Sequence, residues 1–156
     1  MTTYSDNLRL TLIGVGEEDG TWGVTTNTNL GTLLEQAISG YTTYACTGGT
    51  DTITIPDGAS GTARNMYLEL TGTGGGTLEV PNYKKLYFVY NNTTSGSVTV
   101  KVSGGTGVAI PNGYRVALVC NGTDIYPAIN YVPLTLIAVS DLEVLSTITC
   151  LLYTSD

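Results

Sequence analysis

The acidic side chains are the residues of this 156-residue sequence that could do catalytic chemistry, because it holds thirteen Asp and Glu but no His. Without His, the Ser-His-Asp and Cys-His arrangements of nucleophilic catalysis are excluded. Glycoside hydrolysis needs only two carboxylates on either side of a sugar bond. The sequence does not show which acids converge, and the central part of the chain offers Asp51, Asp57, Glu69, Glu79 and Asp124. We expect these acids to be solvated residues of turns and strand faces, and we expect no enzyme.

Glycine-rich loops are a second feature that could hold a ligand. Residues 14–20 follow a short strand, but their three consecutive acids would repel a phosphate and lack the ligand spacing of a calcium loop. Residues 71–77 and 104–107 are expected to be hairpin loops, because neither leads into the Lys-Ser/Thr and helix of a phosphate loop. Residues 48–53 resemble one unit of a calcium-binding β-roll, which functions only in tandem stacks. We therefore assign no catalytic, metal-binding or cofactor-binding residue, and we expect no cofactor.

The three cysteines form an odd set without the spacing of a zinc site. Cys120 continues the alternating phase of Val116 and Leu118, which indicates a strand residue that points into the core. We expect Cys46 and Cys120 to be small buried hydrophobic residues. Cys150 belongs to an unusual terminal segment, residues 150–156.

The charge of the chain excludes two classes of partner. Its formal net charge is −7, with six Lys and Arg in all. So few cations do not build the basic groove that a phosphate backbone requires, so nucleic acid is excluded as a partner. The same sign excludes anionic membrane surfaces. The first ten residues lack the basic and apolar regions of a secretion signal, so no signal peptide is expected.

Tyrosine is unusually frequent, with eleven in the sequence, and most lie after residue 40. Exposed tyrosines stack on sugars and anchor protein contacts at a low cost in conformational entropy. We expect most of them to cover sheet faces, and the ligand-binding residues are left unknown. The tyrosines of this region are Tyr41, Tyr44, Tyr67, Tyr83, Tyr87, Tyr90, Tyr114, Tyr126 and Tyr131.

Residues 1–40 predict a short strand, a polar loop and one short amphipathic helix, which together could serve attachment or oligomerisation. The strand is indicated by Leu8, Leu10 and Leu12, which alternate with polar residues. The helix is predicted for residues 30–39, where apolar residues recur with the helical period at Leu30, Leu33, Leu34, Ala37 and Ile38.

Three residues around this helix carry specific expectations. Asn29 is expected to cap its amino terminus, with a capping box from Thr32 to Glu35 as the alternative start. Gly40 is expected to end it in the left-handed conformation. Trp22, between two glycines, is expected to be buried and to lock the loop against the helix.

From Tyr41 onward the pattern has period two and predicts an all-β domain over residues 41–132. Pro-Asp and Pro-Asn turns separate the short apolar runs at spacings typical of a mainly antiparallel β-sandwich or jelly roll. Residues 86–90 are apolar on both phases, as in a strand that is buried on two faces or lies at a subunit contact. The residues expected inside are Ile53, Ile55, Leu68, Leu70, Phe88, Val100, Val116 and Leu118.

The last part of the sequence gives two further expectations. Residues 133–149 form an uncertain strand-rich tail. Residues 150–156 resemble the translation of a sequencing-library adaptor, and the alternative is a genuine apolar terminal strand. The adaptor interpretation implies a truncated chain, and we then expect the native protein to continue beyond residue 149.

Two blocks of the sequence resemble bacteriophage tail-fibre and virion structural proteins of marine phages. The first and more specific block is the succession of residues 8–11, 20–23, 26–30 and 34–40, and the second lies within residues 85–123. Together they span about residues 4–132. Such proteins are β-rich and usually trimeric, and they lie at the tail, where the phage meets its host.

The resemblance implies a non-catalytic virion protein that contributes to tail assembly and to host-surface attachment. The implied partners are two further copies in a homotrimer, other virion tail proteins, and a host-surface glycan or protein. The implied location is the virion, after synthesis in the host cytoplasm. Two alternatives stay open, a bacterial surface adhesin or carbohydrate-binding module, and a fragment of a polysaccharide depolymerase.

Overall fold

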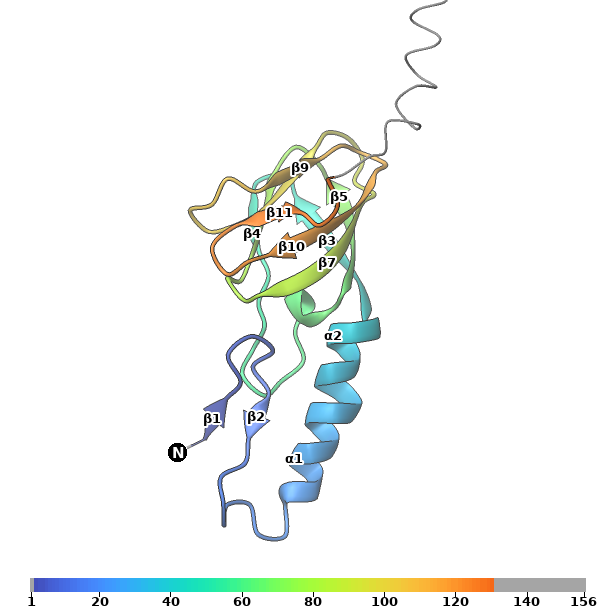
Figure 1. Ribbon diagram of the computed structural model, residues 1–156. Helices are drawn as coiled ribbons and strands as arrows, with labels where there is room; N and C mark the ends of the chain where they lie inside the picture. Colours follow the sequence, from blue (N-terminus) through green and yellow to red (C-terminus); the bar gives the residue numbers. More distant parts are fainter. Residues whose placement is uncertain (1, 131–156) are drawn as a thin grey trace, which may run out of the picture.

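The computed structural model describes residues 2–130, which form an N-terminal arm (residues 2–40) and a β domain (Figure 1). In the arm, strands β1 (Thr3–Tyr4) and β2 (Thr11–Leu12) pair in an antiparallel hairpin. A continuous helix follows, made of α1 (Trp22–Thr28), a π-helical segment (Asn29–Leu34) and α2 (Glu35–Ser39). Helix and hairpin project together from one end of the β domain (Figure 1). The sequence expectations for residues 133–156 lie outside the described residues.

The helix begins at Trp22, well before the position that the apolar period predicted, so both predicted starts, Asn29 and the capping box from Thr32 to Glu35, are wrong. Asn29 lies inside the helix, where its side-chain amide donates to the Thr11 carbonyl at 2.8 Å and accepts from the Thr11 N–H at 3.1 Å. It thereby joins the helix to β2. Gly40 ends the helix with extended backbone angles, and a Cβ there would lie 2.5 Å from the Gln36 carbonyl oxygen. Gly40 is therefore required for close approach, not for a left-handed turn.

The prediction that Trp22 is buried is also wrong. Trp22 is the first residue of α1, and 61% of it is exposed. The acidic loop before it leads directly into the helix, since the Glu18 carbonyl accepts hydrogen bonds from the N–H groups of Thr21 and Trp22. The indole ring therefore lies on the outside of the arm and does not lock the loop. No helix within residues 2–130 is both long and apolar enough to cross a membrane.

The β domain consists of two packed sheets. The first has the strand order β11-β10-β7-β5-β3, and the second has the order β4-β6-β8-β9. Its strands are β3 (Tyr41–Thr47), β4 (Thr50–Thr52), β5 (Tyr67–Thr73), β6 (Thr77–Val80), β7 (Lys85–Asn91), β8 (Val98–Val102), β9 (Val108–Ile110), β10 (Arg115–Cys120) and β11 (Ile125–Pro127). A short 3-10 turn, Thr62–Arg64, precedes β5.

The pairing of these strands corrects the expected topology. From β3 to β8, consecutive strands alternate between the two sheets. Two consecutive strands, one in each sheet, make one circuit, and each new circuit adds its strands parallel to those of the previous circuit. Parallel neighbours usually need a helical crossover, but here a strand of the opposite sheet makes the crossover. Only β9, β10 and β11 add antiparallel pairs to this domain. The two-layer β architecture is confirmed, but its sheets mix parallel and antiparallel pairs, so the mainly antiparallel pairing is wrong.

Most of the predicted core is confirmed. Ile53, Ile55, Leu68, Leu70, Val100 and Leu118 are buried between the sheets, as are Cys46 and Cys120. Phe88 is an error, since it is 38% exposed on the outer face while Tyr87 and Val89 beside it point inward. Val116 is only partly buried at the margin of the core.

The glycine loops connect the circuits and differ in kind. Residues 104–107 join the antiparallel strands β8 and β9, as a hairpin loop should. The predicted hairpin loop at residues 71–77 is wrong, because this segment leaves β5 in one sheet and residues 74–76 carry the chain to β6 in the other. A Cβ on Gly74 would lie 1.6 Å from the Ser95 carbonyl oxygen, and one on Gly76 would lie 2.3 Å from that of Gly49. Loops of successive circuits thus lie against one another at distances that only glycine permits.

Lys85 is a buried cation at the start of β7, and it yields a first prediction. Its ammonium group donates to the Leu86 carbonyl at 3.3 Å and lies 4.8 Å from the centre of the Tyr87 ring. Desolvation by burial, reinforced by the nearby Arg64, lowers the pKa of Lys85 from 10.5 to about 8. Below pH 8 the Lys85 ammonium is charged in both the folded and the unfolded state, so the folded protein bears the full cost of desolvating that charge. Between pH 8 and 10.5 the unfolded chain binds more protons, and stability from this group rises with pH.

Replacing Lys85 with Met is therefore expected to stabilise the protein at pH 7 by about 2–3 kcal/mol. The gain should shrink as the pH approaches 10.5, and urea denaturation at several pH values measures it. Lys84→Met, at the exposed neighbouring position, is the matched control and should change little at any pH. A loss of stability in Lys85→Met at pH 7 would show that the ammonium contacts outweigh the burial cost.

Candidate functional site

The five acids considered as catalytic candidates are each held by structural partners. Asp51 accepts from the N–H and hydroxyl of Thr47, at 2.9 and 3.0 Å. Asp124 accepts from the N–H groups of Thr106 and Gly107 in the 104–107 loop and of Ile125 at the start of β11. The other three carboxylates pair across the surface, Asp57 with Arg9 at 2.6 Å, Glu79 with Lys101 at 3.8 Å, and Glu69 with Tyr41 and Asn92. These contacts give each acid a role in the fold.

The acidic loop and the cysteines were the remaining candidates for metal chemistry. Within residues 2–130, no three Cys, Asp or Glu side chains gather in a way that could hold a metal ion. Cys46 and Cys120 are free thiols in the core, and burial raises the pKa of Cys46 to about 11. A thiol that stays protonated at neutral pH is a poor nucleophile and a poor ligand.

The outer face of the five-stranded sheet brings together four aromatic side chains, three of them tyrosines that the sequence analysis named without placing them side by side. We call the outward side chains of Tyr41, Tyr67, Phe88 and Tyr90 the aromatic face. Backbone register places Tyr41 beside Tyr67, and Tyr67 beside Phe88, in one row across β3, β5 and β7. Ala117 of β10 continues this row, and its small side chain leaves the rings open on that side.

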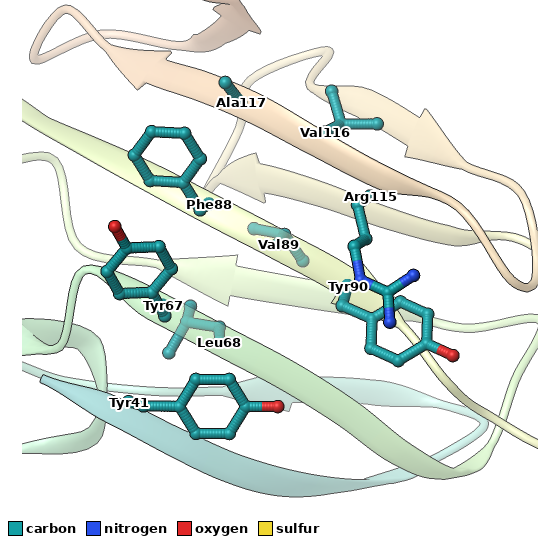
Figure 2. Close-up of a pocket in the computed structure, with 9 residues that line it drawn as sticks. All are labelled: Tyr41, Tyr67, Leu68, Phe88, Val89, Tyr90, Arg115, Val116 and Ala117. Atoms are coloured by element: carbon teal, nitrogen blue, oxygen red, sulfur yellow. The ribbon is translucent and has the colours of Figure 1, made fainter.

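The rings of the aromatic face lie close together. The centres of the Tyr67 and Phe88 rings are 5.1 Å apart, and the ring planes differ by 19°. Figure 2 shows the four rings from β3, β5 and β7 on the same side of the sheet, with Arg115 of β10 beside Tyr90. Together with neighbouring residues they line a shallow concavity of about 510 Å³. This volume lies in the range of small-molecule binding sites.

Polar groups border the rings on the adjacent row of the sheet, where Glu69, Tyr90 and Arg115 are cross-strand neighbours. The Tyr41 hydroxyl donates to Glu69, and the Asn92 amide donates to the same carboxylate at 2.7 Å. These two hydrogen bonds, that of Tyr41 first, lower the pKa of Glu69 and keep it ionised. The Arg115 guanidinium carbon lies 3.6 Å from the centre of the Tyr90 ring. The face therefore combines apolar rings with one anion and one cation held in fixed positions.

One feature of the sequence pointed towards this face. The apolar residues on both phases of 86–90 indicated a strand with two apolar sides, and β7 does present Leu86 and Phe88 outward. The contributions of β3, β5 and β10 could not be found in the same way, because they depend on which strands lie side by side. A tyrosine at the start of a strand gives no signal of its neighbours in the sheet.

The resemblance to tail-fibre proteins rests on short blocks of residues spread over both the arm and the β domain. No family model, curated protein or solved structure matches the chain. A place among tail-fibre proteins is therefore a proposal.

Proposed function

We propose that this chain is a non-catalytic virion structural protein of the phage tail-fibre type, which forms a homotrimer through its N-terminal arm. The β domain would then be displayed to other tail proteins or to the host surface. The observation that carries this proposal is the arm helix, whose apolar side chains are only partly covered by the described residues. The expected location in the virion follows from the proposed role.

The arm helix has little stability of its own. Its sequence contains Gly23 and Gly31 and is otherwise rich in Thr and Asn, which are poor helix formers, and Glu35 is its only charged residue. A helix of this length and composition is marginal in water unless a face of it is packed. Only Leu33 and Ala37 of the helix are buried within the described chain. Further packing would have to come from outside residues 2–130, and we propose that other copies of the chain supply it.

Further copies of the same chain suit the uncovered part of the helix. Leu30 and Ile38, eight residues apart, are each 58% exposed. Because the helix is almost uncharged, identical helices would meet without repulsion. Closed rotational symmetry buries the same face in each copy, which is the usual arrangement in homo-oligomers. The resemblance to tail-fibre proteins supports three copies.

The adhesin or carbohydrate-binding alternative is favoured by a separate observation, the aromatic face on the β domain. Exposed rings beside fixed polar groups suit the recognition of a ligand with both apolar and hydroxyl-bearing sides. This role is compatible with a tail-fibre protein, since a displayed domain can carry a binding face. No contact among the described residues favours the depolymerase fragment over these two.

The double variant Leu30→Gln/Ile38→Gln tests assembly through the arm. Gln is a good helix former, so the change removes apolar surface and leaves helix propensity largely intact. In the unaltered chain, helical circular dichroism at 222 nm is expected to rise with protein concentration as copies associate. The variant should show less helix and no dependence on concentration. Tyr114→Gln, which alters a 64% exposed residue of the β domain, is the control and should behave like the parent chain. Concentration-independent helicity in the parent would contradict the proposal.

A further inference from the structure

We propose that the aromatic face binds an oligosaccharide through a carboxylated pyranose. The apolar C–H side of this sugar would lie on the rings of Tyr67 and Phe88, and its carboxylate would meet the Arg115 guanidinium. This binding site goes beyond the proposed assembly role and does not depend on it, because the arm contributes no residue to the face.

The arrangement of the rings points to a flat ligand with an apolar side. Neighbouring strands lie about 4.8 Å apart, so three adjacent strands that each present a ring form a continuous strip. Tyr41 is 61% exposed, Tyr67 39% and Phe88 38%, so the strip is open to solvent. A pyranose presents axial C–H groups on one side and hydroxyl groups at its edge. The rings would cover the first, and the polar groups along the border would bind the second.

Charge complementarity selects the acidic kind of sugar. Arg115 is the cation of this face, and among the described residues no carboxylate lies within ion-pair distance of it. The Tyr90 ring holds the guanidinium in place. Its planar fork matches a carboxylate in a bidentate manner. Hydrogen bonds from Tyr41 and Asn92, and then the charge of Arg115, lower the pKa of Glu69. Among the described residues Glu69 forms no ion pair with the guanidinium, and its carboxylate has lone pairs left for sugar hydroxyls.

Two other occupants fit less well. Nucleobases also stack on aromatic rings, but a strand of nucleic acid needs several cations along its backbone, and this face offers one. A second copy of the chain would place Arg115 and Glu69 in an interface, where their burial is costly unless each charge meets a partner. A carboxylated sugar satisfies both the rings and the unpaired cation.

Isothermal titration of the full chain with uronate hexamers tests the proposal. The panel comprises oligogalacturonate, oligomannuronate, oligoguluronate and a hyaluronan hexamer, and the methyl esters of each serve as neutral controls. We expect at least one acidic member to bind with a Kd of about 1 mM or tighter, and its ester to bind at least about tenfold more weakly. Titration with an oligothymidylate tests nucleic acid as the occupant of the face. Measurement of the protein's molecular mass under the same conditions tests a second copy of the chain.

Three variants of the face and two control variants locate the binding. Arg115→Gln and Phe88→Ser should each weaken binding at least about tenfold, and Arg115→Lys should fall between Arg115→Gln and the parent. Tyr126→Ser, at an exposed tyrosine on β11 of the same sheet, and Lys84→Gln, at an exposed lysine, are the matched controls and should bind like the parent. Thermal unfolding of each variant, together with amide chemical-shift changes in the parent at Tyr67, Phe88 and Arg115, separates a lost contact from a lost fold.

Four results would overturn the proposal. They are no binding of any acidic hexamer at 10 mM, equal affinity for an acid and its ester, unchanged binding in a folded Phe88→Ser variant, and oligothymidylate or a second copy as the occupant of the face. None of them would bear on assembly through the arm, which is measured on Leu30 and Ile38.

Discussion

Replacing Arg64 with Ala is expected to lower the free energy of unfolding by on the order of 4 kcal/mol. Arg64 has no exposed surface, and its guanidinium donates to the carbonyl groups of Leu8, Pro56 and Ala59. Alanine would leave these carbonyls without a donor and open a cavity the size of the side chain. Urea denaturation of parent and variant measures the loss.

Arg64 also joins the arm to the β domain, because Leu8 lies in the arm and Pro56 and Ala59 lie in the long connection after β4. Hydrogen exchange in the β1–β2 hairpin should therefore quicken more in Arg64→Ala than exchange in β7. Arg64→Lys should recover only part of the stability, because one ammonium group cannot reach three separate carbonyls. Arg9→Ala, which removes an exposed ion pair with Asp57, is the control and should cost far less. Equal losses in Arg64→Ala and Arg9→Ala would contradict this account.

Replacing Asn91 with Ala is expected to cost about 3 kcal/mol. The buried Asn91 amide donates to the carbonyls of Gly96 at 3.1 Å and Ile110 at 2.8 Å, and its oxygen accepts from the N–H and hydroxyl of Thr93. It thereby fixes the turn after β7 and connects it to the end of β9.

The Asn91→Asp variant sharpens this prediction. A carboxylate can accept from Thr93 but cannot donate to the two carbonyls, so the loss at pH 7 should exceed that of Asn91→Ala. The loss should decrease at low pH, where the protonated acid can donate to one carbonyl. Asn82→Ala, at an exposed turn position, serves as the control. A stability difference between Asn91→Asp and the parent that did not change with pH would count against a role for the two donated hydrogen bonds. Urea denaturation across the pH range measures each loss.

The sequence allowed the strands and most of the core to be predicted, but not the way the strands pair. Alternation of apolar and polar residues is the same in parallel and antiparallel ladders, because it reports only the two sides of one strand. A regular spacing of equivalent residues would have revealed the circuits, but the spacing is irregular. Tyr41, Tyr67 and Phe88 lie side by side on successive parallel strands, yet more residues separate the first two than the last two. Glycine loops of neighbouring circuits lie against each other, yet hairpin loops are also rich in glycine, so loop composition did not distinguish a circuit from a hairpin.

The arm helix was predicted too short for a physical reason. Its first half consists mostly of Gly, Thr and Asn, with Trp22 and Val24 as its apolar residues, so neither apolar period nor propensity marks it as helical. The bond between Asn29 and the Thr11 backbone fixes this half from outside, and tertiary contacts of this kind leave no trace in local sequence.

The aromatic face was missed because the two sides of β7 are both apolar. With Leu86, Phe88 and Tyr90 on one side and Tyr87 and Val89 on the other, either phase could have formed the core. The choice depends on which side meets the second sheet. The four rings then come together through the order of strands, which no single segment encodes.

Sedimentation equilibrium of the full chain at tens of micromolar tests the central claim, assembly of a structural protein through its N-terminal arm. The account predicts a mass of three times the 16.4-kDa protomer, which falls towards one protomer on dilution and in the Leu30→Gln/Ile38→Gln variant. A mass of one protomer at every concentration, in a chain whose helix is intact by circular dichroism, would contradict it.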